Sequence, residues 1–221
     1  MKISSKIYHN EGNTQVLKRV PKSAINILDI GCGQGDNARV LKEDGKIIDG
    51  ITISESEFEF ASNHTRNMYL HNLEEGLPEK VRLNHYDAVI ASHVLEHICY
   101  PDQVLSDIAS ALKPAQGVLI VALPNIMHYK SRIELIKGNF NYNTSGIWDD
   151  THFKWYTYIS ASRLLENSGF EVISRSVSGL LPFHSTLKRL PLGLYKLLNK
   201  CLLGFSPGLF GSQLIYVARP K

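Results

Sequence analysis

The sequence predicts one α/β domain over residues 1–221, built on a doubly wound, Rossmann-like sheet of seven strands. The sheet is expected to be mostly parallel with an antiparallel last strand, and to carry helices on both faces. Apolar runs of strand length alternate with amphipathic runs of helix length, which is typical of this class. In three strand runs, the first, fourth and fifth, hydrophobicity is continuous and does not alternate, which predicts burial on both faces. With 43% hydrophobic residues, 221 residues suffice for one substantial core.

The first part of the chain supplies five strands and three helices. Ser54 is a plausible N-cap, because Glu57 follows three residues later in a capping-box spacing. Pro101 stands where another helix is expected to start. The expected strands are 25–30, 46–53, 68–73, 86–92 and 117–124, and the expected helices are 36–44, 54–64 and 101–113.

The last part of the chain completes the sheet. The stretch ISASRLLENSGF predicts a helix closed by glycine, and EVISRSV a sixth strand. SQLIYVARPK predicts a seventh strand, antiparallel beside the sixth. Two stretches stand outside this alternation. They are an insertion at residues 125–157 and an apolar, lysine-containing insertion at residues 180–211.

Composition narrows the class of protein. Cys32, Cys99 and Cys201 are widely separated and form no CxxC pair, so neither a disulfide framework nor a zinc knuckle is predicted. The start MKISSKIYHNEGN lacks the apolar core of a signal peptide, and no run reaches the roughly 18 apolar residues of a membrane span. A cytoplasmic location is predicted, with peripheral contact at the inner face of the membrane as a second interpretation.

Charge is unevenly distributed along the chain. The net charge is +3, but no acidic residue follows Glu171. Seven basic residues do follow it, at positions 175, 188, 189, 196, 200, 219 and 221. This end either faces an acidic surface or a phosphorylated substrate, or is simply solvated.

A glycine loop, ILDIGCGQGDN, follows the first strand. In a doubly wound sheet the ligand crevice lies at the carboxyl ends of the strands. The loop has glycines at 31, 33 and 35; a dinucleotide fingerprint GxGxxG would need glycine where Asp36 stands, and a GxxxxGK[ST] loop is absent. Asp29, just before the loop, is a charged acceptor. A negatively charged hydrogen-bond acceptor suits a ligand that carries an ammonium group better than a ligand that carries a phosphate.

Several motifs in register resemble the class I S-adenosylmethionine-dependent methyltransferases, over roughly residues 25–175. LDIGCGQG is similar to that family's first motif, and YDAVIASHVLEHI and VLSDIASALKPAQGVLIVALPN are similar to its fourth-strand and fifth-strand motifs. The resemblance implies S-adenosyl-L-methionine as cofactor and S-adenosyl-L-homocysteine as product. It also implies which residues hold the methionyl end: Asp29, Gly31, Cys32, Gly33 and Gly35.

The end of the second strand departs from the family pattern. Most members have an acidic residue there for the ribose hydroxyls, whereas this chain has Thr52. Asp49, three residues back, should point to the other face of the strand. Cyclopropane-forming and mycolate-modifying members have a threonine followed five residues later by glutamine, and here Glu57 takes that place. We expect Thr52 and Glu57 to hold the ribose jointly; the alternative for Glu57 is the capping role.

The same resemblance assigns the rest of the cofactor site. Asn72 stands where the family has an adenine-contacting aspartate, and its amide oxygen can still accept from the adenine amino group. Leu73 should add a backbone contact. Ser92 and His93, at the end of the fourth strand, should face the cofactor where the methyl group is donated.

Methyl transfer to a hydroxyl or amine benefits from a general base, for which histidine is best suited near neutral pH. His93, His97, His128 and His152 follow the fourth strand. His93 and His97 flank Glu96 at a spacing that metal ligands can use, but such a pair without a further ligand is more often structural. No metal site is therefore predicted. Glu96 and His97 resemble the family's recurring LEH, which usually supports the site.

The insertion contains the preferred base. GIWDDTHFKWYT is similar to the DxTHxRxxT run of methyltransferases associated with cell-surface polysaccharides. We expect His152 to be the general base, oriented by Asp149 or Asp150, with a purely structural histidine as the alternative. The insertion's aromatic residues would form a lid over a sugar-like or aromatic acceptor, or else a small satellite core; they are Tyr129, Phe140, Tyr142, Trp148, Phe153, Trp155 and Tyr156.

Residues 180–211 leave two interpretations open. One is extra core or a homodimer surface. The other is a membrane-interface segment whose lysines meet anionic headgroups, which would suit a lipid-linked saccharide.

The predicted activity is O-methylation of a small-molecule or saccharide hydroxyl, assisted by a histidine. A methyltransferase-like protein that binds the cofactor without turnover is the first alternative, because of Thr52 and Asn72. A nucleotide-dependent oxidoreductase is disfavoured by the GxGxG spacing. Nucleic acid is not an expected acceptor, since ALPNIM follows the fifth strand where an Asn-Pro-Pro-Tyr motif would stand.

Overall fold

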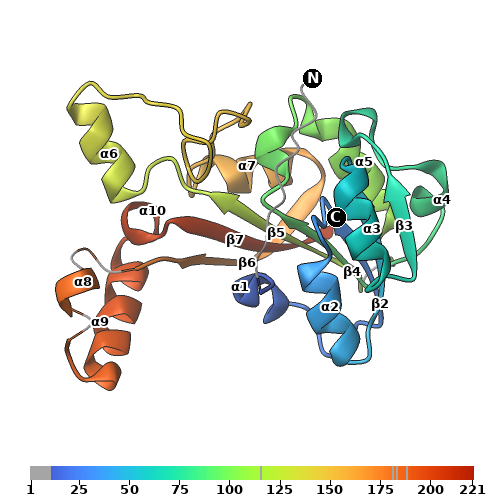
Figure 1. The fold of residues 1–221 in the computed structure, drawn as a ribbon, viewed down its shortest axis with the longest axis horizontal. Helices are drawn as coiled ribbons and strands as arrows, with labels where there is room; N and C mark the ends of the chain where they lie inside the picture. The colour runs from blue at the N-terminus through green and yellow to red at the C-terminus, as the bar shows by residue number, and fades with distance from the viewer. Residues whose placement is uncertain (1–10, 115, 181, 183, 188) are drawn as a thin grey trace.

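The computed structural model describes residues 11–114, 116–180, 182, 184–187 and 189–221. These residues form a seven-stranded sheet in the order β3-β2-β1-β4-β5-β7-β6 (Figure 1). β7 pairs antiparallel with both β5 and β6, and the remaining pairings are parallel. This confirms the predicted fold class. The strands are β1 Asn26–Ile30, β2 Ile47–Thr52, β3 Asn67–Leu70, β4 Ala88–Ser92, β5 Val118–Pro124, β6 Phe170–Ser178 and β7 Gln213–Pro220.

Helices and 3-10 turns connect and flank the strands. Those before β5 are α1 Thr14–Leu17, α2 Asp36–Glu43, α3 Glu55–Ser62, η1 Leu73–Glu75, α4 Glu79–Arg82, η2 Leu95–His97 and α5 Pro101–Ala111. Those after β5 are α6 Tyr129–Ile136, α7 Ser160–Asn167, α8 His184–Leu187, α9 Leu192–Phe205 and α10 Pro207–Phe210.

Both faces of the sheet are covered. Alternate residues of β1 enter different core clusters: Leu28 and Ile30 pack with residues of α5 and α7, whereas Ile27 packs with residues of α1 and α2. All seven residues of β5 are buried. The continuous hydrophobicity of the central strands thus reflects burial between two helical layers, as predicted.

Local signals set most element ends. Ser54 caps α3, with its Oγ accepting a hydrogen bond from the Glu57 N–H at 3.4 Å. Gly169, with φ of +85°, lies beyond the end of α7, as expected for glycine after a helix. The third strand is shorter than predicted and ends at Leu70. The reason is Asn72, whose side chain accepts from the Glu74 N–H at 3.1 Å and starts η1 there.

The insertion at 125–157 is anchored at its ends. Asn125 and Tyr156 form an isolated β-bridge, and α6, which the sequence did not predict, lies between them. The buried Asn125 amide donates to the Gly208 and Gly211 carbonyls at 2.9 and 2.7 Å. Asn125 therefore ties the start of the insertion to α10.

The second insertion forms α8, α9 and α10, with α8 and α9 beyond the ends of β6 and β7 (Figure 1). Of the residues in α9, all of which are described, none is buried. The interpretation of this helix as extra core is therefore wrong: it stands at one end of the sheet, where no second layer covers it. Among the described helices, none is long and apolar enough to cross a membrane.

Candidate active site

The glycine loop between β1 and α2 holds its three alternate glycines in left-handed conformations. The φ angles of Gly31, Gly33 and Gly35 are +60°, +56° and +83°. At Gly31 a Cβ would lie 2.5 Å from Val94 Cγ2, so backbone and side-chain space both require glycine there. The loop therefore packs directly against the segment that follows β4. This is the crevice between β1 and β4, where the strand order reverses.

Asp29 lies at the base of this loop, paired with Gly50 of β2 and Ile90 of β4. Its side chain is 1% exposed, and neither carboxylate oxygen has a hydrogen-bond partner among the described residues. Burial raises the pKa of Asp29 to about 7, a rise that the neighbouring Asn37 side chain offsets only in part. An unpartnered buried carboxylate is costly unless a ligand completes it. An ammonium group is the complement that this position calls for.

Cys32 lies in the same loop and is buried. Burial raises the pKa of its thiol well above the ordinary value, and the nearby carboxylates of Asp29 and Glu57 raise it further. The thiol therefore stays protonated and unreactive near neutral pH.

Thr52 and Glu57 are brought together as predicted. The Thr52 hydroxyl donates to Glu57 Oε2 at 2.7 Å, and both side chains are buried. Burial raises the pKa of Glu57, while the Thr52 hydrogen bond lowers it. Glu57 Oε1 lies 3.9 Å from where a Cβ of Gly33 would be, so the carboxylate borders the glycine loop. Only the backbone N–H of Glu57 serves the cap of α3; its carboxylate turns toward Thr52.

The Asp49 carboxylate is fully hydrogen-bonded to residues outside the candidate cofactor site. Its carboxylate accepts from Arg66 at 3.0 and 2.7 Å, from Asn67 at 3.0 Å and from the Tyr86 hydroxyl at 2.9 Å. These four hydrogen bonds give Asp49 a structural role, in agreement with its predicted orientation away from the site.

The remaining predicted cofactor residues lie along the same edge of the sheet. Asn72 uses one lone pair of its amide oxygen in capping η1, and Leu73 is partly buried against the core. Ser92 Oγ accepts from Asn13 Nδ2 at 3.0 Å, and the same amide donates to Gln213 Oε1 at 3.0 Å. Sequence reasoning missed Asn13 and Gln213, which lie outside every motif. The fold alone brings Asn13 to Ser92 and Gln213 to His93.

His93 is the one non-glycine residue with a left-handed backbone in the described part of the chain, at φ of +58°. Its Nδ1 lies 3.2 Å from Glu96 Oε1 and its Nε2 lies 2.7 Å from Gln213 Oε1. The His93 side chain is 41% exposed, and although partial desolvation lowers its pKa, the bonds to Glu96 and Gln213 outweigh this and raise it. With both nitrogens directed at acceptors, the ring is suited to donate, and this favours a role in positioning Glu96.

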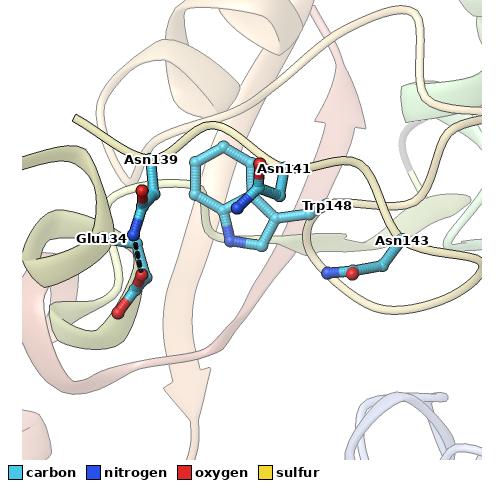
Figure 2. A pocket seen from close by; sticks show the side chains of 5 residues that line it. All are labelled: Glu134, Asn139, Asn141, Asn143 and Trp148. Atoms are coloured by element: carbon cyan, nitrogen blue, oxygen red, sulfur yellow. Dashed lines mark hydrogen bonds between the residues drawn. The ribbon is translucent and has the colours of Figure 1, made fainter. Parts of the chain in front are cut away.

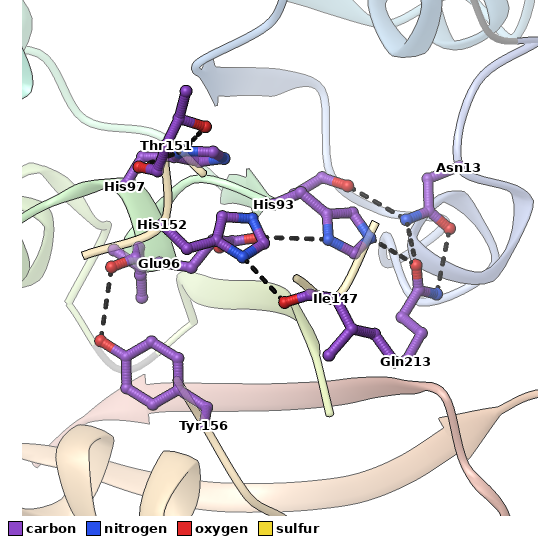
Figure 3. A network of polar contacts seen from close by, with 11 residues as sticks. Asn13, His93, Glu96, His97, Ile147, Thr151, His152, Tyr156 and Gln213 are labelled. Carbon is purple, nitrogen blue, oxygen red and sulfur yellow. Dashed lines mark hydrogen bonds and ion pairs between the residues drawn. The ribbon is translucent and has the colours of Figure 1, made fainter. Parts of the chain in front are cut away.

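Glu96, His97 and His152 converge beside His93 (Figure 3). One ligating atom of each residue lies within 4.8 Å of those of the other two. The His97 and His152 rings pack edge to face, with their centroids 4.7 Å apart. The Phe153 and Lys154 N–H groups donate to the Glu96 carbonyl at 2.9 and 3.1 Å. These bonds hold the end of the insertion against η2.

His152 is 8% exposed, and its Nδ1 contacts the Ile147 carbonyl at 3.2 Å. Burial lowers its pKa, and the Glu96 carboxylate offsets this only in part. The expected orienting carboxylate, Asp149, accepts from the Thr151 N–H and hydroxyl at 2.9 and 2.6 Å. It supports His152 through the backbone, where the His152 N–H donates to the Asp149 carbonyl at 3.1 Å. Glu96 is the carboxylate whose charge acts most strongly on this imidazole.

The aromatic insertion also borders a small polar pocket of about 190 Å³, which is partly open to solvent and is lined by Glu134, Asn139, Asn141, Asn143 and Trp148 (Figure 2). Trp148 packs edge-on against Phe140, with ring centroids 4.5 Å apart. Tyr142 and Trp155 join the same aromatic group. The insertion thus combines a satellite cluster of aromatic rings with an amide-lined pocket.

A family model described as a methyltransferase domain matches residues 8–175. Among curated relatives, the ubiquinone biosynthesis O-methyltransferase of Haemophilus ducreyi is 31% identical over 107 residues, 45% of each chain. The mitochondrial enzyme of the same name from Mus musculus is 28% identical over 173 residues, 73% of this chain and 45% of the mouse protein. The chain spans about half the length of the curated relatives it matches.

A solved S-adenosylmethionine-dependent methyltransferase from Archaeoglobus fulgidus has the same fold, with a TM-score of 0.65 and 22% identity, covering 92% of this chain and 90% of that one. The family match spans the glycine loop, the Thr52–Glu57 pair and the histidine cluster. The chain therefore belongs to the methyltransferase-domain family, with the class I fold and the S-adenosylmethionine-binding crevice of that family.

Proposed function

We propose that this protein transfers a methyl group from S-adenosylmethionine to a hydroxyl oxygen of a small molecule or saccharide. The observation that carries the proposal is a buried imidazole, His152, whose pKa is lowered by burial and which lies beside the crevice that holds the cofactor in this fold. The O-methyltransferase names of the relatives support oxygen as the acceptor atom.

The crevice fits the cofactor residue by residue. Asp29 offers two carboxylate oxygens, without partners from any described residue, to an ammonium group. Thr52 and Glu57 offer acceptors for the ribose hydroxyls, and Asn72 and Leu73 border the place expected for adenine. S-Adenosylmethionine supplies a methyl group on a sulfonium. The enzyme's contribution to such an in-line displacement is chiefly alignment and exclusion of water.

His152 is proposed to take the proton of the acceptor hydroxyl. Because a carbonyl only accepts, the bond to Ile147 places the imidazole proton on Nδ1 and leaves the lone pair on Nε2. As the hydroxyl attacks, its proton passes to Nε2. The adjacent Glu96 carboxylate stabilises the imidazolium that forms.

A saccharide acceptor is supported by the pocket in the insertion. Asparagine amides can both donate to and accept from sugar hydroxyls, and the Trp148 ring offers an apolar face to a sugar ring.

The exposed face of α9 supports a lipid-linked acceptor. Leu194, Leu197 and Phe205 are 44%, 57% and 86% exposed and share one helical stripe. Lys196 and Lys200, which are also exposed, flank this stripe on one side. An apolar stripe with flanking lysines suits the surface of an anionic membrane, which is consistent with a cytoplasmic protein working at the inner leaflet.

A transfer assay tests the proposal. Transfer of a labelled methyl group is measured to a panel of saccharides and phenols. His85→Ala is the control, because His85 is exposed and lies before the start of β4, at the end of the strand away from the site. We expect His152→Ala to lower turnover by about 100-fold or more while adenosylhomocysteine affinity is unchanged. Cofactor binding by the wild type without methylation of any acceptor would instead favour the non-catalytic binding protein.

A further inference from the structure

We propose that Glu96, His97 and His152 form a binding site for one divalent first-row transition-metal ion. The three side chains present one carboxylate and two imidazoles whose ligating atoms lie within 4.8 Å of one another (Figure 3). Sequence spacing drew attention to His93 and His97. The fold brings together a different set, because both ring nitrogens of His93 are taken up by Glu96 and Gln213.

Glu96 supplies the observation that demands a cation. Its side chain is 0% exposed. Oε1 is bonded to His93 Nδ1, but Oε2 has no hydrogen-bond partner among the residues the structure places. A fully buried carboxylate oxygen without a partner carries a large desolvation cost, which a bound cation would remove.

The two histidines are held in the tautomer that a metal requires. His97 Nδ1 lies 3.2 Å from the Thr151 carbonyl and 3.1 Å from the Thr151 hydroxyl, which itself donates to Asp149. Both Thr151 oxygens therefore accept from His97, so the proton is on Nδ1 and the lone pair on Nε2. His152 is fixed in the same way by the Ile147 carbonyl. Metal-binding histidines are typically oriented by such a bond from the second ring nitrogen.

The scaffold holds these ligands together across a large sequence separation. Glu96 and His97 lie in η2, and His152 lies in the insertion. The Phe153 and Lys154 N–H groups donate to the Glu96 carbonyl, which joins the backbone of the insertion to that of η2. These bonds lie at Glu96 itself and directly after His152. A site supported by backbone bonds is pre-organised, so metal binding needs only small side-chain movements.

The donor set selects the kind of ion. Two nitrogens and one oxygen suit Mn²⁺, Fe²⁺, Co²⁺ or Zn²⁺ better than Mg²⁺ or Ca²⁺, which prefer oxygen. Ligands about 2.1 Å from a tetrahedral ion stand about 3.4 Å apart, so binding would draw the side chains together. Three protein ligands leave a coordination position open. A bound ion would take the His152 Nε2 lone pair, so the proposed role of His152 as base in methyl transfer belongs to the metal-free protein.

A metal titration without cofactor or acceptor tests the site, so that its failure is separate from failure of the proposed activity. The protein is stripped with a chelator and titrated with CoCl₂, following the visible absorption of bound Co²⁺. We expect saturation at one ion per chain. His152→Ala and Glu96→Gln should each weaken binding by about 100-fold, in line with the loss of a direct ligand.

The exposed His85→Ala variant is the matched control and should titrate as the wild type does. Adenosylhomocysteine affinity shows that each variant is folded, and if Glu96→Gln fails that check His97→Gln replaces it. Absence of Co²⁺ binding by the wild type would overturn the assignment. So would binding that is unchanged both in His152→Ala and in the second folded ligand variant, which is Glu96→Gln or its replacement His97→Gln.

Discussion

Asp29, which we propose to bind the cofactor, lowers the stability of the unliganded fold. The carboxyl is buried with both oxygens unpartnered by any residue described, and its pKa is about 7 against an ordinary 3.8. Between pH 3.8 and about pH 7, the folded state therefore keeps a proton on Asp29 that the unfolded state has released. This group costs nothing below pH 3.8, and its cost grows as the pH rises until it is complete above about pH 7.

Asp29→Asn should stabilise the unliganded protein more at pH 8 than at pH 5. Since one pKa unit is worth about 1.4 kcal/mol, the gain in free energy of unfolding between these two pH values should be about 2–3 kcal/mol. The same variant should bind adenosylhomocysteine at least about 10-fold more weakly, because a neutral amide no longer pairs with an ammonium group. Urea unfolding at both pH values and a calorimetric titration measure these effects. An equal change in stability at pH 5 and pH 8 would refute the role of ionised Asp29.

The Thr52–Glu57 pair allows a matched test at neighbouring positions. Glu57 is buried and bonded to Thr52, whereas Glu55 is exposed in the same first turn of α3. Glu57→Ala should weaken adenosylhomocysteine binding by about 10-fold or more, since it removes a charge-assisted acceptor for the ribose. Glu55→Ala should change the affinity by less than about 3-fold. Equal small effects in a calorimetric titration of both variants would remove Glu57 from the site.

At the scale of elements, α9 exposes a stripe of apolar side chains. Its exposed residues Leu194, Leu197, Leu198, Cys201 and Phe205 follow one another at helical spacing. Tyr195, Asn199, Leu202 and Leu203, on the other side of the helix, are partly covered. A soluble monomer rarely presents such a stripe without a partner.

We expect the wild type to bind vesicles of anionic phospholipid and to be released by high salt. Leu194→Gln combined with Leu197→Gln should abolish co-sedimentation, because the buried apolar area and the lysine attraction act together. Leu83→Gln is the control, since Leu83 is 72% exposed next to α4 at the other end of the sheet (Figure 1). If the vesicles do not retain the wild type but the double variant changes its mass in sedimentation, the stripe is a homodimer surface.

The insertions show where prediction from sequence stops at this scale. The alternation of apolar and polar runs predicted all seven strands, because each strand is an apolar run in the sequence, even though β3 buries no residue and β6 buries only Phe170. It did not predict α6 or α8 to α10. The short α6 buries only Ser131, and α9 buries none of its described residues, so neither helix contributes apolar side chains to the core.

At the scale of the whole molecule, the crevice between β1 and β4 should link cofactor binding to global stability. A ligand that binds only the folded state at 100 times its dissociation constant adds about 2.7 kcal/mol. For a domain of this size, that corresponds to a rise in melting temperature of about 5–10 °C. Adenosylhomocysteine should give this rise in a thermal melt, and NAD should give none. A larger shift with NAD would revive the oxidoreductase alternative.

The sequence by itself determined the sheet, the glycine loop and the Thr52–Glu57 pair. These features depend on residues within a few positions of one another, where hydrophobic periodicity, glycine and short spacing act directly on the backbone. The departure from GxGxxG at Asp36 was enough to separate this loop from a dinucleotide-binding one.

Only the tertiary structure decided which polar groups meet. His97 and Thr151 are 54 residues apart, and Asn13 and Gln213 are 200 apart, yet each pair is hydrogen-bonded. No local pattern records such contacts, because they follow from strand order and from the backbone bonds that hold the insertion on η2. The physical reason is that the hydrogen bonds and charge interactions of a buried carboxylate such as Glu96 depend on which side chains the fold places next to it.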